Sequence, residues 1–109
     1  MCRGVNLLAA GYPRPMQQLL ELGEVTDCIA ACNACAEACP SCADICTTTA
    51  RELARHAGQD LGLARAFVVA CATRCRLCSA AARKHADVSR ASACHRCDEA
   101  CRRVLASIA

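Results

Sequence analysis

The cysteines in the first half of the chain follow one another at regular steps of four and three residues. Six of them form this series: Cys28, Cys32, Cys35, Cys39, Cys42 and Cys46. On an α-helix with about 3.6 residues per turn, steps of three and four keep every side chain on one face. Residues at this spacing normally form the buried seam of a helical bundle. The sequence therefore predicts a helix whose core-facing stripe consists of thiols.

Two later segments repeat the same spacing. A helix expected over about 60–85 carries Cys71, Cys75 and Cys78, and one expected over about 89–107 carries Cys94, Cys97 and Cys101. Together with the first series they make twelve cysteines in helical register. Each is a candidate metal ligand, because a thiolate stripe in a core is unusual for packing alone.

The fold class indicated by the sequence is all-α. No segment alternates apolar and polar residues for long, so no strand is predicted. We expect an N-terminal extension over residues 1–14 and a cysteine-rich antiparallel four-helix bundle over residues 15–109. Its first helix is predicted to be short and to end near Gly23, with Thr26 or Asp27 capping a second helix over about 27–56. Pro40 is expected to kink this second helix, because the cysteine spacing crosses it without losing phase.

Short turns near Gly58 and Asp87 predict that successive helices run antiparallel. Counting residues from these turns predicts four pairs of cysteines at matching heights: Cys46 with Cys71, Cys39 with Cys78, Cys78 with Cys94, and Cys75 with Cys101. The three cysteine series are therefore expected to meet inside the bundle.

The two ends of the predicted bundle differ in chemistry. The end near Gly58 is expected to be an apolar plug that consists of Leu53, Leu61, Ala64, Phe67 or Val68, Val104 and Ile108. The end near Asp87 is expected to load metal. Cys28 and Cys32 are predicted to reach this second end, at the height of His85.

The total of thirteen cysteines admits a disulfide scaffold as one interpretation. An odd count, a helical repeat and the lack of a visible signal peptide favour reduced thiols in a cytoplasmic protein instead. The net charge of +3 is spread over several helices, so nucleic-acid binding is not indicated, and no apolar run suggests a membrane span.

Thiolates are soft ligands that select Cu(I), Zn(II) or iron–sulfur clusters. Each Cu(I) that replaces a thiol proton leaves the net charge unchanged, so many ions fit a narrow core. The run Cys32, Cys35, Cys39 and Pro40 matches C-x2-C-x3-C-P, the end of a bacterial ferredoxin motif, which keeps an iron–sulfur protein as an alternative. A zinc or general soft-metal buffer is the other.

The pattern resembles the bacterial copper storage proteins, a family of cysteine-rich four-helix bundles. The resemblance covers about residues 26–107 and rests on Cys42-Ala43-Asp44-Ile45-Cys46, on Cys71, Cys75 and Cys78 ending near Lys84-His85, and on Cys94, Cys97 and Cys101. It implies that the twelve helical cysteines bind many Cu(I) ions, commonly in a tetramer. It also implies that His85 and Met16 are candidate entry ligands. Unlike the family pattern, residues 15–23 carry no cysteine.

The expected function is therefore the storage or detoxification of Cu(I) by a binding protein that is not an enzyme. No nucleophile–base pair, phosphate loop or pair of catalytic carboxylates is recognisable. The expected partners are copper ions, a copper chaperone or efflux system that delivers or removes them, and further copies of the chain in a dimer or tetramer.

Overall fold

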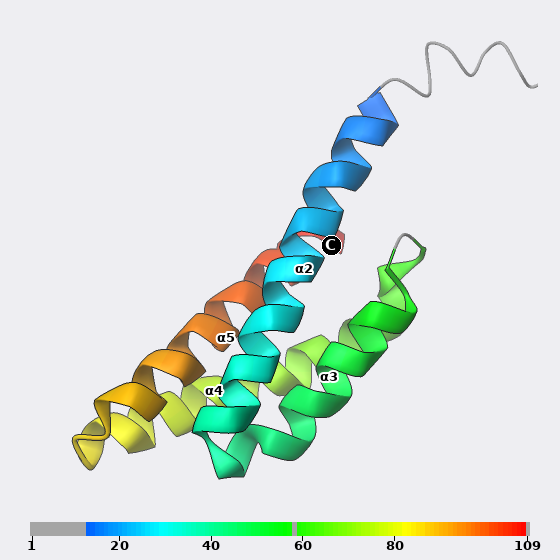
Figure 1. Ribbon diagram of the computed structural model, residues 1–109. Helices are drawn as coiled ribbons and strands as arrows, with labels where there is room; N and C mark the ends of the chain where they lie inside the picture. Colours follow the sequence, from blue (N-terminus) through cyan, green and yellow to red (C-terminus); the bar gives the residue numbers. More distant parts are fainter. Residues whose placement is uncertain (1–12, 58, 109) are drawn as a thin grey trace, which may run out of the picture.

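The computed structural model describes residues 13–57 and 59–108, with side chains from Leu22 onward (Figure 1). Every regular element within these ranges is helical, which confirms the all-α class. The elements are α2 (Pro13–Ala38), the 3-10 turn η1 (Pro40–Cys42), α3 (Ala43–Arg55), the 3-10 turn η2 (Leu61–Ala64), α4 (Arg65–Lys84) and α5 (Val88–Ile108). Cys2 and Gly58 lie outside the described residues.

Pro40 ends a helix and does not kink it, so the prediction of a kink was wrong. The residue before a proline is driven out of the helical region, and Cys39 is accordingly extended at φ −131° and ψ 100°. Pro40 then opens η1, a position where its missing N–H is harmless. Figure 1 shows the chain reversing here, so that α3 runs back beside α2.

The prediction of a short first helix was also wrong, because α2 continues from Pro13 to Ala38 without a break. Gly23 lies on its exposed side, where a Cβ atom would have no neighbour within 4 Å. A glycine inside a helix costs about 1 kcal/mol relative to alanine, which neighbouring turns outweigh here. Thr26 and Asp27 lie within this helix and cap nothing.

The other two connections agree with the predicted helices. Asp60 caps η2 by accepting a hydrogen bond from the Gly62 N–H at 2.9 Å. α4 closes at Ala86, whose φ of 56° is left-handed, and the Asp87 N–H donates back to the Ala82 carbonyl at 2.9 Å. This is the geometry that ends many helices, although glycine is more usual at the left-handed position.

Each helix packs against two others. α2 contacts α3 and α5, and α4 contacts α3 and α5 (Figure 1). The apolar end is largely as expected, with Leu53, Leu61, Ala64, Val68 and Val104 buried in one cluster, which Val25 of α2 joins. Ile108 and Phe67 are half-buried. We call the buried residues Val25, Leu53, Leu61, Ala64, Val68 and Val104 the apolar plug.

The prediction that Cys28 and Cys32 reach the end near His85 was wrong, because the chain reverses at Pro40 after α2 ends. They lie toward the apolar plug, where the Cys28 Sγ is 3.6 Å from the Cys101 Sγ. The arginines on the outward faces of α3 and α4 are exposed. Among the described residues, no helix combines the length and the apolar character that crossing a membrane requires.

Candidate metal centre

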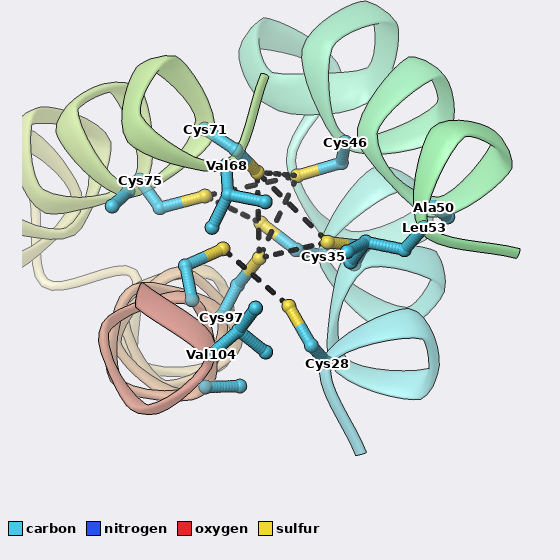
Figure 2. Packing of buried hydrophobic residues seen from close by; sticks show 14 of the residues in the cluster. Cys28, Cys35, Cys46, Ala50, Leu53, Val68, Cys71, Cys75, Cys97 and Val104 are labelled. Atoms are coloured by element: carbon cyan, nitrogen blue, oxygen red, sulfur yellow. Dashed lines mark hydrogen bonds between the residues drawn. The ribbon is translucent and has the colours of Figure 1, made fainter. Parts of the chain in front are cut away.

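The candidate centre consists of free thiols that lie together in the core between the helices. All twelve described cysteines are unpaired, and eleven of them are fully buried. The exception is Cys78, which is partly exposed. Figure 2 shows the sulfurs of Cys35, Cys46, Cys71, Cys75 and Cys97 pointing toward one another. The cysteines therefore meet one another in the interior, and none of the twelve forms a disulfide with another.

The central group takes one cysteine from each of the four helices. Cys35 of α2, Cys46 of α3, Cys75 of α4 and Cys97 of α5 hold their sulfurs within 4.8 Å of one another. The Sγ–Sγ separations are 3.8 Å for Cys35–Cys75, 3.7 Å for Cys46–Cys75 and 3.8 Å for Cys46–Cys97. This group is enclosed on all sides.

A second group of four lies next to it, toward the apolar plug. It consists of Cys32, Cys71, Cys97 and Cys101, all buried and again within 4.8 Å of one another. The Cys32 Sγ is 3.9 Å from the Cys71 Sγ and 3.6 Å from the Cys97 Sγ. Cys97 belongs to both groups of four, so the two are continuous.

Two groups of three continue the series toward the Pro40 turn. One consists of Cys35, Cys42 and Cys94, and the other of Cys39, Cys42 and Cys78. The Cys35–Cys94 and Cys42–Cys94 separations are 3.6 and 3.9 Å. Cys35 links the first of these to the central group, and Cys42 links the two groups of three. The four groups therefore form one connected series along the helices.

Cys28 stands apart from this series. It belongs to no group of three or more ligands among the described residues, and its close sulfur neighbour is Cys101 at 3.6 Å. The hydrogen bond with Cys101, together with one with Cys32, lowers the pKa of Cys28 to about 5. This pair of sulfurs suits a two-coordinate ion, which among soft metals is a Cu(I) preference.

The spacing of the sulfurs matches single ions. Four thiolates around one Zn(II) at a bond length of about 2.3 Å stand about 3.8 Å apart, and three around an ion at a similar length stand about 4 Å apart. The Sγ–Sγ contacts run from 3.6 to 4.0 Å, and all sulfurs of a group lie within 4.8 Å of one another. Each group therefore approaches the spacing that one bound ion requires.

Hydrogen bonds between thiols move their pKa values in opposite directions. A sulfur that accepts S–H bonds is stabilised as the thiolate, and one that donates is stabilised as the thiol. The bond from Cys101 lowers the pKa of Cys71, whereas the bond to Cys35 raises the pKa of Cys75. At Cys42 the main cause is burial, which raises the pKa because a buried thiolate is poorly solvated.

Binding of Cu(I) is expected to weaken as the pH falls. Thiols with raised pKa values, such as Cys42 and Cys75, hold their protons at neutral pH, so each ion that they bind must displace a proton. Affinity should then fall about tenfold per pH unit for each proton displaced. Competition with a Cu(I) chelator at pH 6, 7 and 8 measures this slope. A pH-independent affinity would mean that the ligands are already thiolates.

The structure brings most of the sequence-predicted ligands together, with different partners in places. Cys46 meets Cys71 at 3.7 Å, and Cys39 and Cys78 share a group, as predicted. Cys75 does not pair with Cys101, and that prediction was wrong: Cys75 groups with Cys97, and Cys101 with Cys71. Cys94 likewise joins Cys35 and Cys42, and no group of convergent ligands contains both Cys94 and Cys78.

Of the two predicted entry ligands, His85 has a described side chain. His85 caps the C-terminal end of α4, is exposed, and belongs to none of the cysteine groups. The side chain of Met16 lies outside the described ones. One further contact has no sequence motif that would indicate it: Arg74 Nε donates to the Ser41 carbonyl at 3.1 Å and so ties η1 to α4.

Comparison with known proteins gives no match: no family model, no curated protein and no solved structure matches this chain. The resemblance to the copper storage proteins therefore rests on the cysteine spacing of the chain itself.

Proposed function

We propose that this protein stores Cu(I) in the cysteine-lined core of an antiparallel four-helix bundle. The observation that carries the proposal is the connected series of thiol groups, in which Cys35, Cys42 and Cys97 each belong to two groups. Shared sulfurs suit a metal that accepts bridging thiolates and low coordination numbers, and Cu(I) is such a metal. A structural site would need one group, and the described part of the chain has four in contact.

Charge favours Cu(I) over a divalent ion. Eleven of the thiols are fully buried, so any net charge left among them is poorly solvated. Where one thiol proton leaves for each Cu(I) that binds, the net charge of the core is unchanged. A Zn(II) ion held by four thiolates keeps a net charge of about −2. A stack of such ions accumulates negative charge, and each uncompensated buried charge costs several kcal/mol.

A zinc or soft-metal buffer is the second candidate function. The observation in its favour is that the two groups of four are closed, fully buried and spaced as a tetrahedral Zn(II) site requires. The two groups share Cys97, so a zinc protein is expected to stop at two ions. This difference in capacity separates the two candidates.

The fold separates the cysteines of the motif on which the iron–sulfur alternative was based. Cys32, Cys35 and Cys39 lie in the same C-x2-C-x3-C-P run, yet no group of convergent ligands contains two of them. A multi-iron cluster also holds its cysteine sulfurs farther apart than a single ion does. The free thiols require a reducing compartment, and we place the protein in the cytoplasm on that ground.

Titration of the reduced apo-protein with Cu(I) under a competing chelator tests the proposal. One ion for each group of convergent thiols makes four ions, and bridging sulfurs allow more, so uptake is expected to exceed four. The loaded protein is expected to be colourless. A matched Zn(II) titration should stop at two. Cu(I) uptake that stops at one or two ions contradicts storage, and a brown protein indicates iron and sulfide.

Single substitutions check which sulfurs hold the ions. Cys75→Ser removes a ligand of the central group and is expected to lower the Cu(I) capacity. Cys39→Ser is expected to lower it as well. Cys2→Ser is the control, because Cys2 lies outside the helical series, and it should leave the capacity unchanged. An equal loss in all three variants would point to misfolding or general thiol chemistry.

A further inference from the structure

Cys78 differs from the other cysteines of the series in its access to solvent. The eleven others that the structure describes are fully buried, whereas Cys78 is partly exposed. Its sulfur still lies within 4.8 Å of the sulfurs of Cys39 and Cys42. The last group of the series thus has one ligand that a molecule in solution can reach.

The helices are unequal in length at this end, and this inequality exposes Cys78. The chain reverses between α2 and α3 at Pro40. This turn lies at the height of Cys78, since Cys39 and Cys42 flank Pro40 and share a group with Cys78. α4 and α5 continue beyond this height to their own turn at Ala86 (Figure 1). The α2–α3 turn therefore covers the Cys39 and Cys42 side of the group and leaves the Cys78 side uncovered.

One hydrogen bond keeps the group assembled despite its exposed position. Arg74 lies one helical turn before Cys78 on the same face of α4. Its Nε donates to the carbonyl of Ser41, which lies between Pro40 and Cys42 in η1. The turn that carries Cys42 is thereby held against the helix that carries Cys78.

The opposite end of the series offers no such access. Cys28 and Cys101 are fully buried, and Val25 and Val104 of the apolar plug lie beside them in the same buried cluster. An ion bound there can leave only by passing along the series of sulfurs or by opening the helices. Of the two ends, the one at Cys78 is therefore the end that a molecule in solution can reach.

We propose that Cys39, Cys42 and Cys78 form the exchange site at which Cu(I) passes between the protein and a thiol carrier, with Cys78 as the ligand that is replaced. The carrier is a low-molecular-weight thiol or a cysteine of a donor protein, since a soft thiolate is what competes for Cu(I). This proposal rests on the proposed function, because it assumes that Cu(I) is the stored ion.

The step is a ligand substitution that balances in atoms and charge. The carrier thiol loses its proton and its sulfur bonds to the Cu(I) held by the three cysteines. The bond from copper to the Cys78 sulfur breaks, and Cys78 takes up that proton. Copper remains Cu(I) throughout, so no oxidant or reductant is needed. The reverse sequence loads an ion from the carrier.

Alkylation of the native apo-protein tests the access of Cys78 without any metal. Iodoacetamide is expected to modify Cys78 first among the twelve cysteines of the series, at least about tenfold faster than Cys28, because only exposed thiolates react readily. Peptide mapping by mass spectrometry identifies the modified residue. Equal rates at Cys78 and at the buried cysteines would overturn the proposal.

Transfer kinetics test the role of Cys78 in exchange. Cu(I)-loaded protein is mixed with reduced glutathione and a chromophoric Cu(I) chelator, and the rate of copper release is recorded. Cys78→Ser is expected to slow release by about tenfold or more, because a hydroxyl is a poor Cu(I) ligand and the exchange site without its third sulfur is seldom occupied by an ion that the carrier can take. Cys28→Ser removes a sulfur at the other end, so it should lower capacity while the rate stays within about twofold.

Failure of this proposal is distinguishable from failure of copper storage. If the protein takes up more than four Cu(I) ions and Cys78→Ser releases them at the wild-type rate, storage stands and the exchange site is wrong. If Cys28→Ser slows release as much as Cys78→Ser, exchange is not confined to the Cys78 end, and the proposal is again overturned. Circular dichroism of both variants establishes that they are folded.

Discussion

Loading the protein with Cu(I) is expected to raise its thermal unfolding midpoint by roughly 20 °C for a single occupied group. The central group joins Cys35, Cys46, Cys75 and Cys97, one from each helix, so an ion bound there ties all four helices together. At a free Cu(I) concentration a thousandfold above Kd, one site adds about 4 kcal/mol to the free energy of unfolding. Each kcal/mol moves the midpoint of a domain of this size by about 4–8 °C.

Differential scanning calorimetry of apo and loaded protein under anaerobic conditions measures this shift. The matched variant is Cys46→Ser, which removes α3 from the central group, and its shift on loading should be smaller than that of the wild type. Apo and loaded proteins that unfold at one temperature would show that copper does not bind across the helices.

Replacing Leu53 by alanine is expected to destabilise the apo-protein by about 3 kcal/mol, within a range of about 2–5. Leu53 is a large, fully buried side chain in the apolar plug, and its loss leaves a cavity there. The plug contains no sulfur ligand, so the capacity for Cu(I) should remain that of the wild type. Stability and metal binding are thus expected to depend on different residues of one core.

Urea denaturation of Leu53→Ala, followed by a Cu(I) titration of the same variant, separates the two properties. Leu63→Ala provides the control, since Leu63 is 67% exposed and its truncation should change the free energy of unfolding by no more than about 0.5 kcal/mol. A Leu53→Ala protein that keeps its stability would mean that the apolar plug contributes little to folding.

The cysteine spacing was sufficient to predict the buried positions but left the path of the chain undetermined. A stripe with steps of three and four stays inside whether the helix continues past Pro40 or reverses there, because both paths keep the same face toward the core. The conformational restriction on Cys39, immediately before Pro40, decides for reversal. The prediction that a helix ends near Gly23 failed for a different reason. Packing of the rest of the helix against its neighbours overrides the low helix propensity of glycine.

The pairing error between α4 and α5 also has a simple physical source. The predicted heights were counted from Asp87. On that count the height of Cys101 differs equally from the heights of Cys71 and Cys75. The structure centres this turn on Ala86, the residue with a left-handed backbone. Cys71 lies fifteen residues before Ala86 and Cys101 fifteen after it, which places them in the same group. A single residue at a turn thus decides which sulfurs can share an ion.

The proline between the two halves of the first cysteine stripe also controls whether the sulfur sites are completed within one polypeptide. If residue 40 allowed a straight helix, the segment now forming α3 would extend away from its own α4 and α5. Its thiols would still be in the correct phase to dock on a second molecule, which is how domain-swapped dimers arise. The ring of Pro40 therefore lets each polypeptide complete its own sulfur groups, and its loss would let two polypeptides form these groups together.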